Sequence, residues 1–120
     1  MVNMRENVLK AKSFNLAVRI VGLYRHLCES KKEFVLSKQV LRSGTSVGAN
    51  IREAEHSQSK SDFIHKMAIA QKEINETIYW LELMQATNLL SQEEFDSINS
   101  DAVEIIKLIT SSIKTAKKNG

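Results

Sequence analysis

The chain has 120 residues, 42% hydrophobic and 26% charged, and a formal net charge of +3, which together predict one globular domain with its own apolar core. A single cysteine, Cys28, excludes an intrachain disulfide, and no apolar run approaches the roughly 18 residues of a membrane span. We therefore expect a cytoplasmic protein. No proline and only four glycines occur, which favours long helices over an all-β fold.

Apolar residues recur every three to four positions in four segments of the chain. They predict helices over residues 4–30, 37–57, 60–88 and 92–117, with Ser37, Ser59 and Ser91 as the N-caps of the last three. Short polar connections separate these segments, and helices joined in this way pack most simply as antiparallel neighbours. The sequence thus predicts an all-α, antiparallel up-down-up-down four-helix bundle, with residues 1–120 as a single domain.

The first predicted helix is apolar over most of its circumference. One apolar seam contains Phe14, Ala17, Val18, Val21, Tyr24 and Cys28, and a second contains Leu9, Leu16 and Leu23. A helix with so narrow a polar side, inside a small bundle, predicts a further covering surface, which is usually another subunit. Burial of both seams within the monomer is the alternative, but only three partner helices are available for it.

The second predicted helix carries small and polar residues. Gly44 and Gly48 permit close approach of a neighbouring backbone. A phosphate-binding loop is excluded, because the spacing is too short and Ala49-Asn50 stand where Lys-Ser/Thr should follow. A polar ridge is formed by Ser46, Asn50 and Glu53, for which Glu76 of the third helix or an adjoining subunit is a candidate partner. We interpret these four residues as a hydrogen-bonded network that fixes helix register.

The third predicted helix has a main apolar stripe and a second apolar face, whereas the fourth has a single clean stripe. The second face of the third helix contains Ile69, Trp80 and Leu83. Its sequence differs from that of the Leu9, Leu16 and Leu23 seam. Two unlike patches that pair head to tail form a heterologous interface, which can close into a ring. We therefore predict that these six residues form the interface of a homo-oligomeric ring.

A family resemblance is carried by residues spread over positions 10–117. These are Leu41-Arg42-Ser43, Ser46, Ala49-Asn50-Ile51, Glu53, Ser59, Asp62-Phe63, Ala68-Ile69-Ala70 and Glu76. In this pattern the chain resembles the bacterial "four helix bundle protein" family, also known as the 23S rRNA intervening-sequence protein family. The resemblance implies a helical bundle that assembles as a homopentameric ring. It also implies kinship with a branch that assists retroelement reverse transcriptases and binds nucleic acid through a basic surface, and it implies no catalytic residues. Arg52 and Ala54 depart from the family pattern in a minor way.

Positive charge is concentrated in the first half of the chain, which is +6 over residues 1–60, whereas residues 61–120 are −3. The candidate nucleic-acid-binding residues are Arg5, Lys12, Arg19, Arg42 and Arg52. On one helix such cations are most often a solvated face, but several copies in a ring would sum to a field that holds RNA or DNA by its phosphates. No aromatic residue is interleaved with them, so base stacking by this set is not predicted.

An alternative function is a small metal-dependent or nuclease-like enzyme that uses Arg52, Glu53 and His56. The Glu53-x-x-His56 spacing occurs in di-iron bundles, but the second motif and the additional inward glutamates are missing. No nucleophile stands near a histidine at a plausible turn. We therefore predict a non-enzyme without metal or cofactor, whose partners are copies of itself and RNA or DNA, with no membrane or small-molecule substrate.

Overall fold

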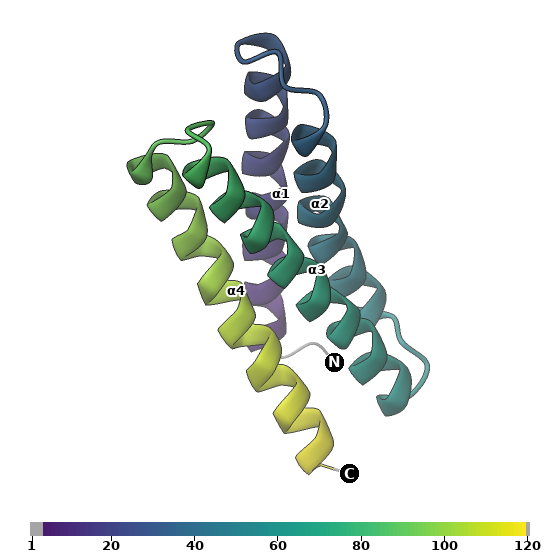
Figure 1. The fold of residues 1–120 in the computed structure, drawn as a ribbon. Helices are drawn as coiled ribbons and strands as arrows, with labels where there is room; N and C mark the ends of the chain where they lie inside the picture. Colours follow the sequence, from purple (N-terminus) through teal and green to yellow (C-terminus); the bar gives the residue numbers. More distant parts are fainter. Residues whose placement is uncertain (1–3, 120) are drawn as a thin grey trace.

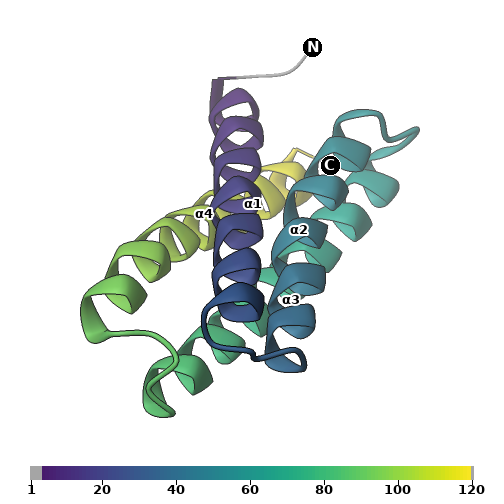
Figure 2. The ribbon, with the colours of Figure 1, turned by 90° about the horizontal axis from the view of Figure 1, so that it is seen from above.

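The computed structural model describes residues 4–119, which form four α-helices and no strand. The helices are α1 (Met4–Glu29), α2 (Leu36–Glu55), α3 (Lys60–Ala86) and α4 (Gln92–Lys118). The predicted all-α class is confirmed, and the predicted helix ends lie within two residues of the observed ones. Figure 1 shows the chain turning back at each of its three connections, and α1 contacts both α2 and α4. Figure 2 shows α4 crossing α1 at an oblique angle.

Serine side chains cap the last two helices as predicted. The backbone N–H of Asp62 donates to Ser59 Oγ at 3.0 Å at the start of α3. At the start of α4, the N–H of Glu94 donates to Ser91 Oγ at 3.1 Å, and the N–H of Ser91 donates to the Glu94 carboxylate at 2.8 Å. This reciprocal pair is a capping box, which satisfies two backbone donors that a helix start leaves unpaired.

The cap of α2 differs from the prediction. Ser37 was expected at the N-cap, but it lies inside the first turn and is fully buried. The Glu33 carboxylate takes that role, because it accepts the backbone N–H groups of Ser37, Leu36 and Val35 at 2.8, 3.0 and 3.1 Å. Burial opposes ionisation of Glu33, but these hydrogen bonds outweigh it and lower its pKa.

Small residues of α2 allow α1 and α2 to approach closely. A Cβ added at Gly44 would lie 2.8 Å from Cγ1 of Ile20, which is fully buried in α1. A Cβ added at Gly48 would lie 3.5 Å from the Ser13 carbonyl oxygen. Gly44 thus leaves room for a side chain rather than for the predicted neighbouring backbone, whereas Gly48 faces the Ser13 backbone at an ordinary contact distance that a Cβ would also fit. This crossing turns the Ile20 side of α1 into the core.

The predicted oligomer seam of α1 is wrong in two of its three residues. Leu9 is 0% exposed and Leu16 is 1% exposed, because both belong to the core of the single chain. The other seam instead faces outward, leaving Phe14 and Val18 53% and 56% exposed. Two equally apolar seams cannot be ranked by periodicity alone. Which of the two seams is buried depends on which helix the polar side of α1 contacts, and this helix is α4.

The predicted second face of α3 is only half-buried, and part of it serves the monomer. Trp80 packs partly against the core, as does Leu23 of α1. Its indole N–H donates to the Glu76 carboxylate at 3.0 Å, and its ring meets that of Tyr79 edge to face at a centroid distance of 5.1 Å. Ile69 and Leu83 are also half-buried. Trp80 therefore has contacts within its own chain that explain its position without a second subunit.

Candidate nucleic-acid interface

Two of the predicted phosphate-binding cations on α1 are paired with acidic residues of α4. Lys12 forms an ion pair with Glu104. Arg19 Nη1 lies 2.7 Å from the Asp101 carboxylate, and Arg19 also donates to the Ser97 side chain at 2.9 Å. These pairs explain the orientation of α1, because its basic stripe lies along the acidic side of α4. A paired cation contributes little net charge to a distant phosphate, so the predicted stripe is a weaker attractor than its sequence indicates.

Two further predicted cations, Arg5 and Arg52, contact uncharged groups instead of carboxylates. Arg5 donates to Thr115 Oγ1 at 2.9 Å and to the Ser111 carbonyl at 3.4 Å, both on α4. The guanidinium carbon of Arg52 lies 5.4 Å from the ring centroid of Phe14, which is a cation–π contact between α2 and α1. Neither contact neutralises the cation. Both arginines therefore keep their full charge at the surface.

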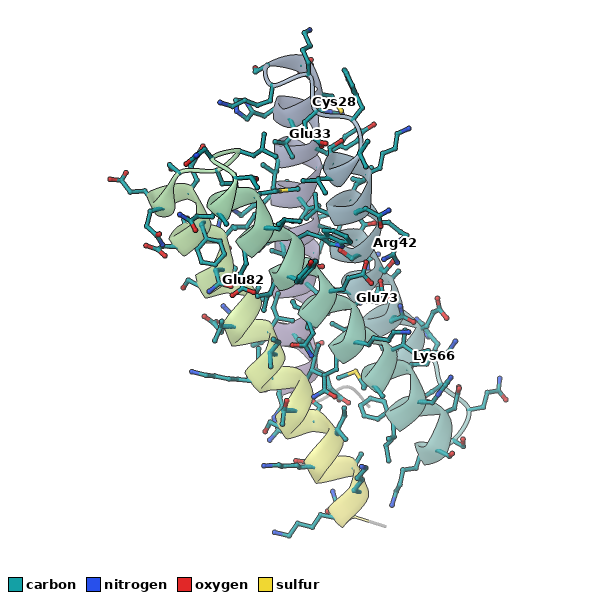
Figure 3. The ribbon with its side chains drawn as sticks, in the orientation of Figure 1. Cys28, Glu33, Arg42, Lys66, Glu73 and Glu82 are labelled. Carbon is teal, nitrogen blue, oxygen red and sulfur yellow. The ribbon has the colours of Figure 1, made fainter. Side chains whose placement is uncertain are left out.

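Arg42 bridges two carboxylates of α3. It donates to Glu73 at 3.0 Å and also pairs with Glu76. The Glu73 side chain is only 11% exposed, so Arg42 compensates a largely buried negative charge. The hydrogen bond from Trp80 and that from Arg42 hold the pKa of Glu76 below its ordinary value. Figure 3 shows Arg42 and Glu73 side by side between α2 and α3. This predicted nucleic-acid contact is thus a structural ion-pair cluster.

A buried hydroxyl pair next to this cluster was not predicted. Thr77 Oγ1 lies 2.9 Å from Ser43 Oγ and donates to the Glu73 carbonyl at 2.8 Å, and both hydroxyl residues are fully buried. A signal was present in the sequence: Ser43 stands between Val40 and Val47 at core spacing. Small hydroxyl residues at such positions are hydrogen-bonded when buried.

The predicted network of Ser46, Asn50, Glu53 and Glu76 does not form. Ser46 Oγ donates to the backbone carbonyl four positions earlier, and Asn50 Nδ2 donates to the carbonyl of Ser46 at 2.9 Å. Glu53 accepts from Lys66 Nζ at 2.8 Å, whereas Glu76 pairs with α3 and α2 partners already described. Short polar side chains in a helix often bond to their own backbone in this way, which removes the need for a partner in another helix.

The alternative catalytic set is not brought together as a reaction centre. Glu53 is paired with Lys66 across to α3, Arg52 covers the Phe14 ring, and exposed His56 ends α2 as its C-cap. A cavity of about 140 Å³ lies between α1, α2 and α3, but these three residues do not line it. Among residues 4–119, no group of three or more His, Cys, Asp or Glu side chains is placed to hold a metal ion.

Three exposed lysines in the connection between α1 and α2 and in the first turn of α2 were not predicted as binding residues. Lys31, Lys32 and Lys38 form no ion pair with any residue in the described part of the chain. The sequence marks residues 29–33 only as a polar connection. Exposed Phe34 lies within the same segment. This end of the molecule therefore carries basic surface that no ion pair in the described part of the chain neutralises.

The fold and its charged surface define a small all-α helical-bundle protein whose buried polar groups and ion pairs join its own helices. Residues 5–111 match the family described as 23S rRNA-intervening sequence protein, and the chain belongs to this family.

A crystal structure from Bacteroides thetaiotaomicron VPI-5482 is similar to this chain over almost its whole length. It is described as a protein with unknown function from the S23 ribosomal protein family, and it shares 59% sequence identity and a TM-score of 0.92. The likeness covers 92% of this chain and 99% of that one. No curated protein matches the chain. Within residues 4–119, none of the helices combines the length and apolar character that crossing a membrane requires.

Proposed function

We propose that the protein is a non-catalytic, antiparallel up-down-up-down bundle that assembles with copies of itself and, once assembled, binds RNA or DNA by the phosphate backbone. The observation that supports self-assembly is the exposed apolar face of α1. Phe14 and Val18, one helical turn apart, are more than half exposed, and half-buried Ala17 and Val21 adjoin them. Contiguous exposed apolar surface of this kind marks interaction sites on otherwise polar proteins.

A second copy of the chain is the occupant that we propose for this face. The family resemblance implies a homopentameric ring, and a ring needs one exposed apolar patch on each subunit that a neighbour covers. The predicted patch of Leu9 and Leu16 cannot serve, since both are buried in the monomer. Phe14 and Val18 replace them as the proposed α1 contribution, and half-buried Ile69 and Leu83 of α3 remain candidates for the opposite side.

Multi-angle light scattering tests the assembly. We expect wild-type protein to exceed its 13.6 kDa monomer mass, and Val18→Asp to shift it toward monomer, because a charge would be buried at the interface. Val103→Asp is the matched control, since Val103 is also exposed but lies on α4. A wild-type monomer at micromolar concentration, or equal effects of the two variants, would contradict the proposed interface.

Nucleic-acid binding is supported by the basic character of the chain and by its family. The sequence pI is about 9.1, and the family is described by its link to 23S rRNA intervening sequences. Assembly would add the fields of several subunits, which strengthens attraction for a polyanion. Fluorescence anisotropy with labelled RNA should show binding that weakens steeply as salt rises. Absence of binding to both RNA and DNA at low salt would refute this part of the proposal.

A further inference from the structure

We propose that the connection between α1 and α2 holds an unpaired base of single-stranded RNA or DNA, with Phe34 stacking on the base and Lys32 and Lys38 contacting the flanking phosphates. This inference rests on the proposed nucleic-acid binding. It goes further by assigning the contact to residues outside the predicted basic set and by specifying a single strand as the ligand.

The charge at this connection is available to a ligand. Three of the five predicted cations, Lys12, Arg19 and Arg42, are ion-paired within the chain. Lys32 and Lys38 are exposed and have no ion-pair partner in the described part of the chain. Neighbouring Lys31 is also exposed, but part of its charge acts on Glu94. The hydrogen bonds with Ser91 are the main cause of the lowered pKa of Glu94, and the charge of Lys31 lowers it further. The charge of Lys32 and Lys38 is therefore available to a phosphate.

Phe34 supplies an exposed aromatic ring at a sequence position between these two lysines. Its side chain is 53% exposed, and that of the next residue, Val35, is 69% exposed. Exposed aromatic side chains interleaved with cations are the usual platform for single strands, since every base has a face that can stack. Among the predicted basic residues, Arg52 already covers the Phe14 ring, and Arg42 shares the Glu76 carboxylate with the half-buried Trp80 indole.

The backbone on both sides of Phe34 is fixed. The N–H of Glu33 donates to the Leu27 carbonyl at 2.9 Å, and the Glu33 carboxylate accepts the N–H groups of Val35, Leu36 and Ser37. Figure 3 places Glu33 at this end of the bundle, beside the connection. The Glu33 carboxylate is hydrogen-bonded to the start of α2, and these bonds are present before any phosphate binds. A connection fixed in advance loses little conformational entropy on binding, which favours affinity.

A single strand fits this surface better than a duplex or a membrane. In a duplex the base faces are stacked on one another and an aromatic ring cannot reach them, whereas unpaired bases are open to stacking. A lipid bilayer would have to be held by the side chains of Phe34 and Val35, which together have fewer carbon atoms than a myristoyl chain. One such chain alone gives only marginal membrane binding.

The test uses anisotropy of a labelled 12-nucleotide single strand and of a duplex of equal length. Phe34→Leu keeps an apolar side chain but removes the ring, and we expect it to weaken single-strand binding by about tenfold or more while leaving duplex binding unchanged. Phe34→Tyr restores the ring and should restore affinity. Tyr79→Leu is the matched control, because Tyr79 is also an exposed aromatic residue, at 57%, but lies on α3 outside the proposed interface, and it should have no effect on the single strand.

Salt dependence tests the lysines separately. Lys32→Gln combined with Lys38→Gln should reduce the slope of log K against log salt by about 1.4, which corresponds to two phosphate contacts with a single strand. If the wild type binds neither ligand, the proposed function itself fails. If the wild type binds the single strand, and both Phe34→Leu and the double lysine variant bind it as well as the wild type does, the proposed function stands and this inference is overturned. Phe34-dependent sedimentation with phosphatidylserine vesicles and no single-strand binding would also overturn it.

Discussion

Replacing each of three helical glycines by alanine tests the packing of α1 against α2, because the structure predicts different signs at chemically identical changes. Alanine in a helix interior is favoured over glycine by about 0.5–1 kcal/mol. At Gly22 nothing lies within 4 Å of an added Cβ, so the full gain is expected. At Gly48 the nearest atom is 3.5 Å away, an ordinary contact, so Gly48→Ala should also stabilise the fold.

Gly44→Ala should instead destabilise the protein. The added Cβ would lie 2.8 and 2.9 Å from Cγ1 and Cγ2 of Ile20, and these atoms cannot swing away because Ile20 is fully buried and branched at Cβ. Overpacking in a core costs about 1–3 kcal/mol, which outweighs the helix-propensity gain and leaves a net loss of up to about 2 kcal/mol. Urea unfolding at one protein concentration measures all three variants on the same scale.

A double variant locates the cause. Ile20→Val keeps both close γ carbons, so it should not reduce the loss of stability that Gly44→Ala causes. Ile20→Ala removes them, so its own cost of about 2–5 kcal/mol should be smaller by about 1–2 kcal/mol when alanine occupies position 44. The packing argument is refuted if Gly44→Ala stabilises the protein as much as Gly22→Ala does.

Three further predictions concern polar groups. Glu33→Gln should cost about 1 kcal/mol at neutral pH because α2 loses its cap; since the folded pKa of Glu33 is lowered below 4.5, this difference should be complete above pH 4.5 and disappear as pH falls through the folded pKa, as measured by urea unfolding at several pH values. Thr77→Val should cost about 1–3 kcal/mol by leaving the buried Ser43 hydroxyl with only its 3.5 Å hydrogen bond to the Val40 carbonyl, and adding Ser43→Ala should recover part of the loss in a double-mutant cycle. Arg42→Met should raise the pKa of Glu76 toward 4.5, as followed by NMR titration, and should destabilise the fold at neutral pH more than at acid pH; an unchanged pKa would contradict the ion pair.

Helix positions and two of the three caps could be predicted from the sequence, because both depend on local patterns. Apolar spacing fixes where a helix lies, and Ser91 followed by Glu94 defines its start without tertiary information. The start of α2 could not be predicted from the usual capping residues, because Glu33 acts from the connection and depends on how the chain turns there. The left-handed backbone of Lys32, with φ of 55°, is part of that turn.

The orientation of α1 and the candidate site needed the structure. The spacing of Arg5, Lys12 and Arg19 is visible in the sequence, but their α4 partners are more than 75 positions away along the chain. Without those partners both apolar seams of α1 are equivalent, and the cations look free. Long-range pairing therefore decided both the core seam and the charge left for a ligand, and neither follows from helical periodicity.

The composition of α2 has a consequence for how the chain acquires its structure during synthesis. This helix contains two glycines, and serine or threonine at four positions from Ser37 to Ser46, all of which are weaker helix formers than alanine. It contacts both α1 and α3, and the shortest hydrogen bond of its buried Ser43 hydroxyl is to Thr77 of α3. As the chain leaves the ribosome, α1 and α2 are therefore exposed before the element that completes them is made. We infer that structure becomes stable when α3 emerges, so that the first 55 or so residues spend that interval as a weakly ordered, apolar nascent segment.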